Sequence, residues 1–119
     1  MVVKEAKEFE LYDLIKDASP LHPVLVYFYE DGAPLHFSLA PVFEQIAREA
    51  PLAVCVRVSD AECDEQATEK YGISCFPCFL ICKGPSKEKW HTFPITTGQG
   101  LIKTMEQQSI IKEGAVQSH

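Results

Sequence analysis

The chain has 119 residues, of which 46% are hydrophobic and 24% are charged. A chain of this length forms one domain around a single core, and the composition is typical of globular proteins, which excludes disordered, fibrous and collagen-like chains. Seventeen acidic residues against eleven basic ones give a net charge of −6, the wrong sign for contacts with a phosphate backbone. We therefore expect no nucleic-acid partner.

The amino-terminal segment and the cysteines indicate the compartment. No apolar run approaches the roughly 20 residues that cross a bilayer, and residues 1–6 contain no basic segment followed by an apolar one. The five cysteines are odd in number and lie close together, between Cys55 and Cys82, unlike those of a small secreted disulfide scaffold. We expect a cytoplasmic protein in a reducing environment, with no membrane partner.

Hydrophobic periodicity predicts alternating strands and helices in the first half of the chain. A short strand at residues 2–3 precedes a helix whose apolar residues lie between 11 and 18. Residues 24–29 form a continuous β-prone run without polar alternation, which is typical of a central strand covered on both faces. After a turn, apolar residues between 39 and 47 share one face of a second helix.

A third strand and a short third helix follow. Residues 52–58 form the strand, and Ser59 with Glu62 forms a Ser-x-x-Glu capping box, which marks the start of a helix. That helix is expected to end near Gly72. Two further strands, at residues 79–82 and 90–95, are expected to form a hairpin. A last helix is expected at residues 98–105.

This element order predicts the architecture. The order β-α-β-α-β-α-β-β-α indicates an α/β fold with one mixed central sheet and helices on both of its faces. No internal repeat or linker divides the chain, so residues 1–112 are expected to form the domain. The polar and small residues 113–119 are expected to form a flexible carboxyl-terminal tail.

The segment before the fourth strand resembles a known family. Tyr71-Gly72-Ile73-Ser74-Cys75-Phe76-Pro77 resembles the Tyr-Gly-Ile-x-x-x-Pro segment of the thioredoxin fold, whose element order is the same. The resemblance covers residues 2–110 and implies that Pro77 is the family's cis-proline.

The residues that carry thioredoxin chemistry are missing from this sequence. Thioredoxins have Trp-Cys-Gly-Pro-Cys after the second strand, where a helix amino terminus stabilises a thiolate. Residues 31–36 here read Asp-Gly-Ala-Pro-Leu-His, with neither cysteine. Tyr27 aligns with the buried aspartate that assists proton transfer in that family.

Residues 29–47 are more similar to the thioredoxin-like domain of phosducin-like proteins, which also lacks the paired cysteines. That family acts by protein binding and as co-chaperones, so the resemblance implies a binding module without a cofactor rather than an enzyme. A cis-proline loop exposes backbone groups that can accept an extended peptide by strand addition, so the expected partner is a protein or an extended peptide. The expected binding groove comprises Gly32, Ala33, Pro34, Phe76 and Pro77.

A thiol-disulfide oxidoreductase or redox sensor is the alternative hypothesis, because Cys75 and Cys78 have Cys-x-x-Cys spacing. In an extended segment, three links of about 3.3 Å put the two Cα atoms roughly 10 Å apart, beyond the limit of about 7 Å for a disulfide, and a cis bond shortens only one link. Cys75 alone could still form mixed disulfides. With Cys63 as a second exposed thiol, a disulfide-linked dimer through Cys75 or Cys63 is a further expectation.

The remaining polar residues predict neither a metal site nor another catalytic centre. Cys78 and Cys82 lie about 13 Å apart along one strand, and no second Cys-x-x-Cys completes a zinc site. His36 begins the second helix with only Ser38 near it as a nucleophile, so we expect a solvated surface histidine. Trp90 on the hairpin strand is expected to serve in packing.

Overall fold

The structure, a computed structural model, describes residues 3–117. The helices and strands follow the predicted order, and two single-turn 3₁₀ helices are added at Asp60–Glu62 and Lys87–Lys89. The elements are β1 (Val3–Glu5), α1 (Glu8–Ala18), β2 (Val24–Tyr29), α2 (Pro34–Glu49), β3 (Val54–Ser59), α3 (Glu65–Tyr71), β4 (Cys78–Cys82), β5 (Trp90–Pro94) and α4 (Gly98–Gln107). Residue 2 of the predicted first strand lies outside the described residues.

The five strands form one mixed sheet in the order β1-β3-β2-β4-β5. β1, β3 and β2 run parallel, whereas β4 is antiparallel to β2 and β5 is antiparallel to β4. All six residues of β2 are buried, as the continuous apolar run predicted for a central strand. The predicted α/β class and mixed sheet are confirmed.

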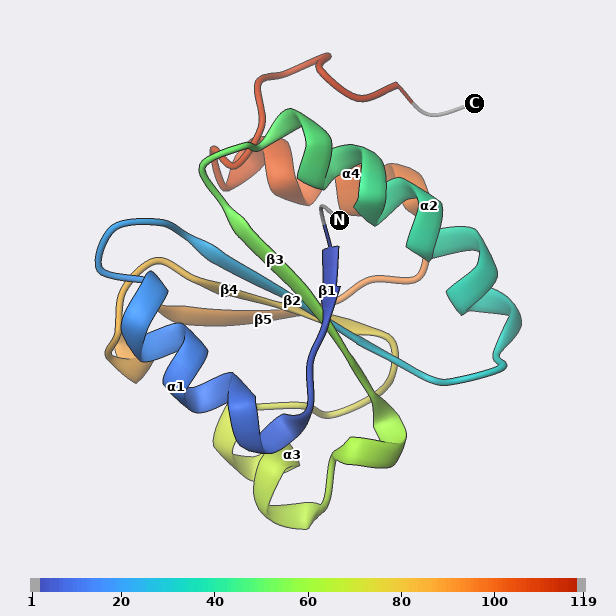
Figure 1. Ribbon diagram of the computed structural model, residues 1–119. Helices are drawn as coiled ribbons and strands as arrows, with labels where there is room; N and C mark the ends of the chain where they lie inside the picture. Colours follow the sequence, from blue (N-terminus) through green and yellow to red (C-terminus); the bar gives the residue numbers. More distant parts are fainter. Residues whose placement is uncertain (1–2, 118–119) are drawn as a thin grey trace.

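Helices cover both faces of the sheet, with α2 and α4 on one face and α1 and α3 on the other (Figure 1). Because side chains of a strand alternate between faces, β2 contributes to both cores. Tyr27 packs beneath α2 and α4 with Phe43 and Phe79. Phe28 packs on the opposite face with Tyr71. The fold therefore has two cores that share the buried strand β2.

The third helix begins later than the capping box predicted. The Ser59 hydroxyl accepts a hydrogen bond from the backbone N–H of Ala61 at 3.3 Å, but it caps only a single 3₁₀ turn. α3 starts after Asp64, whose carboxylate accepts from the N–H of Ala67 at 2.8 Å. The helix ends at Gly72 with φ 70°, the left-handed conformation that glycine adopts without strain.

The chain after α4 packs against α4 and α2 (Figure 1). Val116 is only 6% exposed and belongs to the core beneath α2 and α4, and the N–H of Gly114 donates to the Glu106 carboxylate at 2.8 Å. Within the segment expected to form a tail from 113, Gly114 and Val116 thus contact the rest of the fold, and residues 118–119 lie outside the described part. Within residues 3–117, no helix is both long and apolar enough to cross a lipid bilayer.

Candidate functional site

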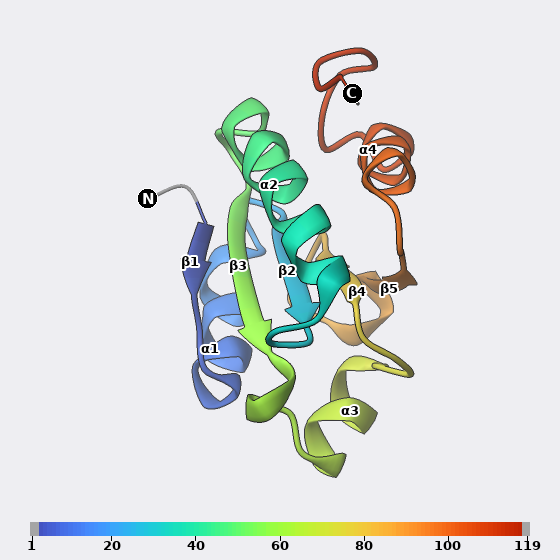
Figure 2. The ribbon, with the colours of Figure 1, turned by 90° about the vertical axis from the view of Figure 1, so that its right-hand side faces the viewer.

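Three segments meet at the edge of the sheet where β2 and β3 end. Phe28 pairs with Cys78, the first residue of β4, so the segment before β4 lies beside the loop that follows β2. In that loop the N–H of Asp31 donates to the Asp60 carboxylate, in the turn after β3, at 3.3 Å. Figure 2 shows the connection from β2 to α2 next to the end of β3. We call this region the loop edge; it comprises residues 30–37, 59–65 and 74–77.

The start of α2 contains no sulfur atom. Gly32 and Pro34 are exposed and Ala33 is half-buried, with Ala33 as the N-cap residue and Pro34 as the first residue of the helix. A helix amino terminus lowers the pKa of a thiol placed there, which is how a dithiol in this position becomes reactive. In this chain the same position offers backbone and apolar groups instead.

The segment before β4 provides a second wall, and only part of it is accessible. The Phe76–Pro77 peptide bond is cis, but Pro77 is buried and Phe76 packs against the core beneath α1 and α3. Pro77, expected in the groove, is thus enclosed, and the exposed part of this segment is Ser74 and Cys75. Within residues 3–117, the backbone groups of Ser74 and Cys75 form no hydrogen bond to other backbone groups.

His36 is half-buried, so the prediction of a solvated surface histidine at this position is wrong. Its Nδ1 lies 3.1 Å from the Tyr27 hydroxyl, and its ring stacks on Tyr29 with centroids 4.2 Å apart. Burial raises the pKa of Tyr27 to about 12 and lowers the pKa of His36 below its ordinary 6.5. At neutral pH the phenol is protonated and the imidazole is neutral, so the hydroxyl and Nδ1 share one hydrogen bond, and the imidazole tautomer sets which of them donates.

Tyr29 is itself fixed by neighbouring strands. Its hydroxyl donates to the Glu5 carboxylate at 2.8 Å, and burial, aided by this bond, raises the pKa of Tyr29 to about 12. Arg57 Nε donates to the same carboxylate at 2.7 Å, and its guanidinium lies 5.6 Å from the centroid of the Tyr29 ring. Tyr27, which aligned with the buried aspartate of thioredoxins, and His36 therefore form an aromatic hydrogen-bonded pair on a fixed support.

Leu35 and Phe37 were not identified as site residues from the sequence. Phe37 is 70% exposed and Leu35 is 38% exposed, both in the first turns of α2. A signal for Phe37 was present, because it falls out of phase with the buried stripe of α2 that includes Leu39 and Phe43, whereas Leu35, four residues before Leu39, continues that stripe at its exposed end. Phe37 is thus one of the five large apolar side chains that residues 3–117 expose, and it is the most exposed one at the loop edge.

The five cysteines are free and differ in accessibility. Cys75 is exposed, whereas Cys78 is 1% exposed and burial raises its pKa to about 12. Cys63, expected to be exposed, is half-buried because it packs against the core beneath α1 and α3. Its Sγ donates to the Ser59 carbonyl at 3.6 Å, and burial raises its pKa to about 11. Cys55 and Cys82 are buried core residues, as predicted.

Trp90 on β5 has a packing role. The Trp90 indole donates to the Gly84 carbonyl at 2.9 Å and stacks on Tyr71 with centroids 5.9 Å apart, so its predicted packing role is confirmed. Among residues 3–117, no group of three or more histidine, cysteine, aspartate or glutamate side chains is arranged to hold a metal ion.

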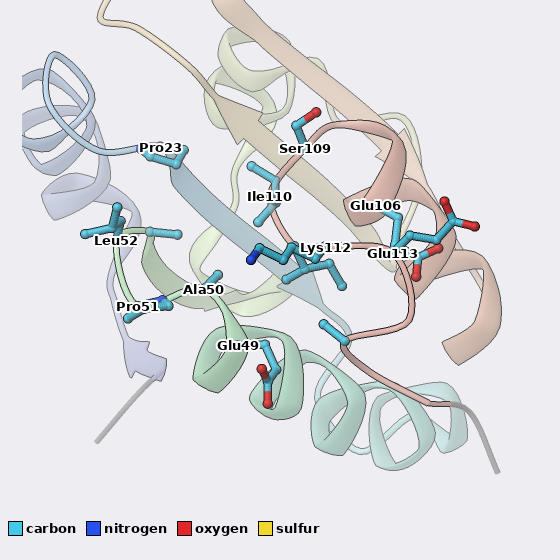
Figure 3. Close-up of a pocket in the computed structure, with 13 residues that line it drawn as sticks. Pro23, Glu49, Ala50, Pro51, Leu52, Glu106, Ser109, Ile110, Lys112 and Glu113 are labelled. Atoms are coloured by element: carbon cyan, nitrogen blue, oxygen red, sulfur yellow. The ribbon is translucent and has the colours of Figure 1, made fainter.

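A cavity of about 860 Å³ lies at the opposite end of the sheet, where β2 and β3 begin (Figure 3). The turn between α2 and β3, with Leu52, forms one side, and Ile110 and Lys112 from the segment after α4 form another. Sequence reasoning missed it because the walls come from turns that are distant in the chain. Its lining contains no cysteine or histidine, so it offers no thiol or imidazole chemistry.

Comparison with known proteins identifies the fold. No protein-family model matches the sequence, and no curated protein matches it. Oxidised thioredoxin O2 from Arabidopsis thaliana is 20% identical, with 89% of this chain and 93% of that chain covered and a TM-score of 0.73. Oxidised thioredoxin from Plasmodium falciparum is 22% identical, with 89% and 97% covered and a TM-score of 0.74. Fasciola hepatica thioredoxin is 23% identical, with 87% and 97% covered and a TM-score of 0.72. The chain therefore has the thioredoxin fold.

Proposed function

We propose that the protein is a binding module that holds an extended segment of a partner protein at the loop edge without exchanging disulfides. One observation carries the proposal: the start of α2, where thioredoxins have their dithiol, contains Ala33, Pro34 and His36, and the imidazole is bonded to Tyr27. No thiolate can form at that helix terminus. The resemblance of residues 29–47 to phosducin-like proteins, which act by protein binding, supports the same function.

The segment before β4 supports binding by strand addition. Ser74 and Cys75 are exposed, and their backbone groups form no hydrogen bond to other backbone groups in the described chain. An extended peptide gains main-chain hydrogen bonds when it pairs with such a segment, and this interaction needs no sulfur. The exposed Phe37 on α2 supplies an apolar contact on the other side of the loop edge.

The cysteines support binding over dithiol chemistry. A dithiol mechanism needs two accessible thiols, one of which attacks while the other resolves the mixed disulfide. Cys75 is exposed, but burial keeps Cys78 protonated, with a pKa of about 12. We propose a reducing, cytoplasmic environment, and the five free cysteines, three of them buried as thiols, are consistent with it.

A disulfide-reduction assay tests this function. Wild type, Cys75→Ser and Cys78→Ser are each added to insulin and dithiothreitol, with a thioredoxin as the positive control and dithiothreitol alone as background. We expect all three proteins to remain at background, with far-ultraviolet circular dichroism showing that each is folded. Robust turnover that either substitution abolishes would overturn the proposal and establish the oxidoreductase alternative.

A further inference from the structure

The first turns of α2 present an apolar surface at the loop edge. Phe37 is 70% exposed and Leu35 is 38% exposed, and Pro34 beside them is also exposed. The hydrogen-bonded pair of His36 and Tyr27 holds this part of the helix against the sheet. A surface of this kind fits a large apolar side chain of a partner.

The loop edge to which this apolar surface belongs is acidic. The loop edge has six carboxylates and no lysine or arginine, and outside it eleven acidic and eleven basic residues balance each other, so the net charge of −6 resides at the loop edge. The six residues are Glu30, Asp31, Asp60, Glu62, Asp64 and Glu65. His36 adds no positive charge at neutral pH, since burial lowers its pKa.

Half of these carboxylates have structural partners. Asp64 caps α3, the Asp60 side chain accepts from the N–H of Asp31, and Glu62 lies 4.0 Å from Lys7. Within residues 3–117, the carboxylates of the other three form no hydrogen bond and no ion pair; these are Glu30, Asp31 and Glu65. Like charges gathered without internal partners repel one another, and a basic partner removes that repulsion.

We propose that the loop edge binds an extended, basic segment of a partner protein that carries a large apolar residue. The inference rests on the proposed function and adds the chemistry of the partner. The apolar side chain contacts Phe37 and Leu35, flanking lysines or arginines face the carboxylates, and the main chain pairs with Ser74 and Cys75. Alternate side chains of an extended segment point in opposite directions, so one segment can present both kinds of group.

Three fluorescent, cysteine-free peptides test the proposal by anisotropy. Each has the same central leucine, flanked by lysines, by glutamines or by glutamates. We expect the lysine peptide to bind most tightly, with an affinity that falls at high salt because exposed charges are screened. We also expect Phe37→Ser to weaken the binding of this peptide, since the apolar contact is lost.

Two matched triple variants separate a local charge effect from a general one. Each removes three exposed carboxylates and changes the net charge equally. The loop-edge variant carries Glu30→Gln, Asp31→Asn and Glu65→Gln. The control variant carries Asp13→Asn, Asp17→Asn and Glu49→Gln. We expect the loop-edge variant to bind the lysine peptide about tenfold more weakly, because each exposed pair contributes modestly, whereas the control changes less than about twofold.

The outcomes distinguish this inference from the proposed function. If all three peptides bind equally and Phe37→Ser weakens each of them, the basic partner is wrong and the binding module stands. If the two triple variants lose affinity equally, the charge effect is general and the inference fails. Absence of binding by every peptide also overturns the inference, whereas the disulfide-reduction assay decides the proposed function separately.

Discussion

Removing one hydroxyl tests how the start of α2 is held in place. In Tyr27→Phe the ring keeps its stacking on Phe79, with centroids 4.7 Å apart, but the hydrogen bond to His36 Nδ1 at 3.1 Å is lost. Such a bond contributes about 0.5–1.5 kcal/mol net to folding. Because His36 is only half-buried, water can hydrate its free nitrogen, so we expect the free energy of unfolding to fall by about 1 kcal/mol.

Urea unfolding, followed by the fluorescence of the single tryptophan, Trp90, measures this loss. The expected change corresponds to a decrease of about 4 °C in Tm for a domain of this size. A double-mutant cycle with His36→Ala isolates the pair, and we expect a coupling energy of about 1 kcal/mol. A Tyr27→Phe protein as stable as wild type, with zero coupling to His36, would refute the bond and the assigned role of Tyr27.

Other predictions concern pH, thiol reactivity and stability. Burial lowers the pKa of His36, so the contribution of this histidine to folding stability is present above pH 6.5 and is lost as the pH falls through its lower pKa in the folded protein. In urea titrations, wild type should therefore lose more free energy of unfolding than His36→Ala between about pH 7 and pH 5. An equal dependence of the two free energies on pH would contradict this. Iodoacetamide followed by mass spectrometry should modify Cys75 first and the three buried cysteines only after unfolding; early modification of a buried thiol would contradict the burial. Phe43→Ala should cost about 4 kcal/mol in urea unfolding, against at most about 0.5 kcal/mol for the exposed Leu21→Ala, and similar losses would contradict the core assignment. Asp64→Ala should cost about 1 kcal/mol by removing the α3 cap, and an unchanged urea midpoint would contradict that role.

The fold could be predicted because its strongest signals are local. The continuous apolar run at residues 24–29 indicates a central strand, and every residue of β2 is indeed buried. The start of α3 was misplaced because Ser59 and Asp64 both suit an N-cap, and only the path of the chain decides which one caps the longer helix.

The site was less predictable because its contacts are not local. Tyr27 and His36 were each singled out in the sequence, but their hydrogen bond depends on how α2 leaves the sheet after β2. Cys63 was expected to be exposed because it lies near the start of the third helix, although its side chain packs beneath α1 and α3. The residue types at the loop edge can be read from the sequence, whereas the burial of their side chains and their hydrogen-bond partners depend on tertiary packing.

We propose above that the loop edge binds a polypeptide through its backbone and without sulfur. Amide chemical shifts of ¹⁵N-labelled protein, recorded under reducing conditions with the cysteine-free lysine peptide, test it directly. We expect the largest shifts at Ser74, Cys75 and the first turns of α2, with the same affinity in Cys75→Ser. Unchanged signals at these residues, or binding that Cys75→Ser abolishes, would contradict sulfur-free binding at the loop edge.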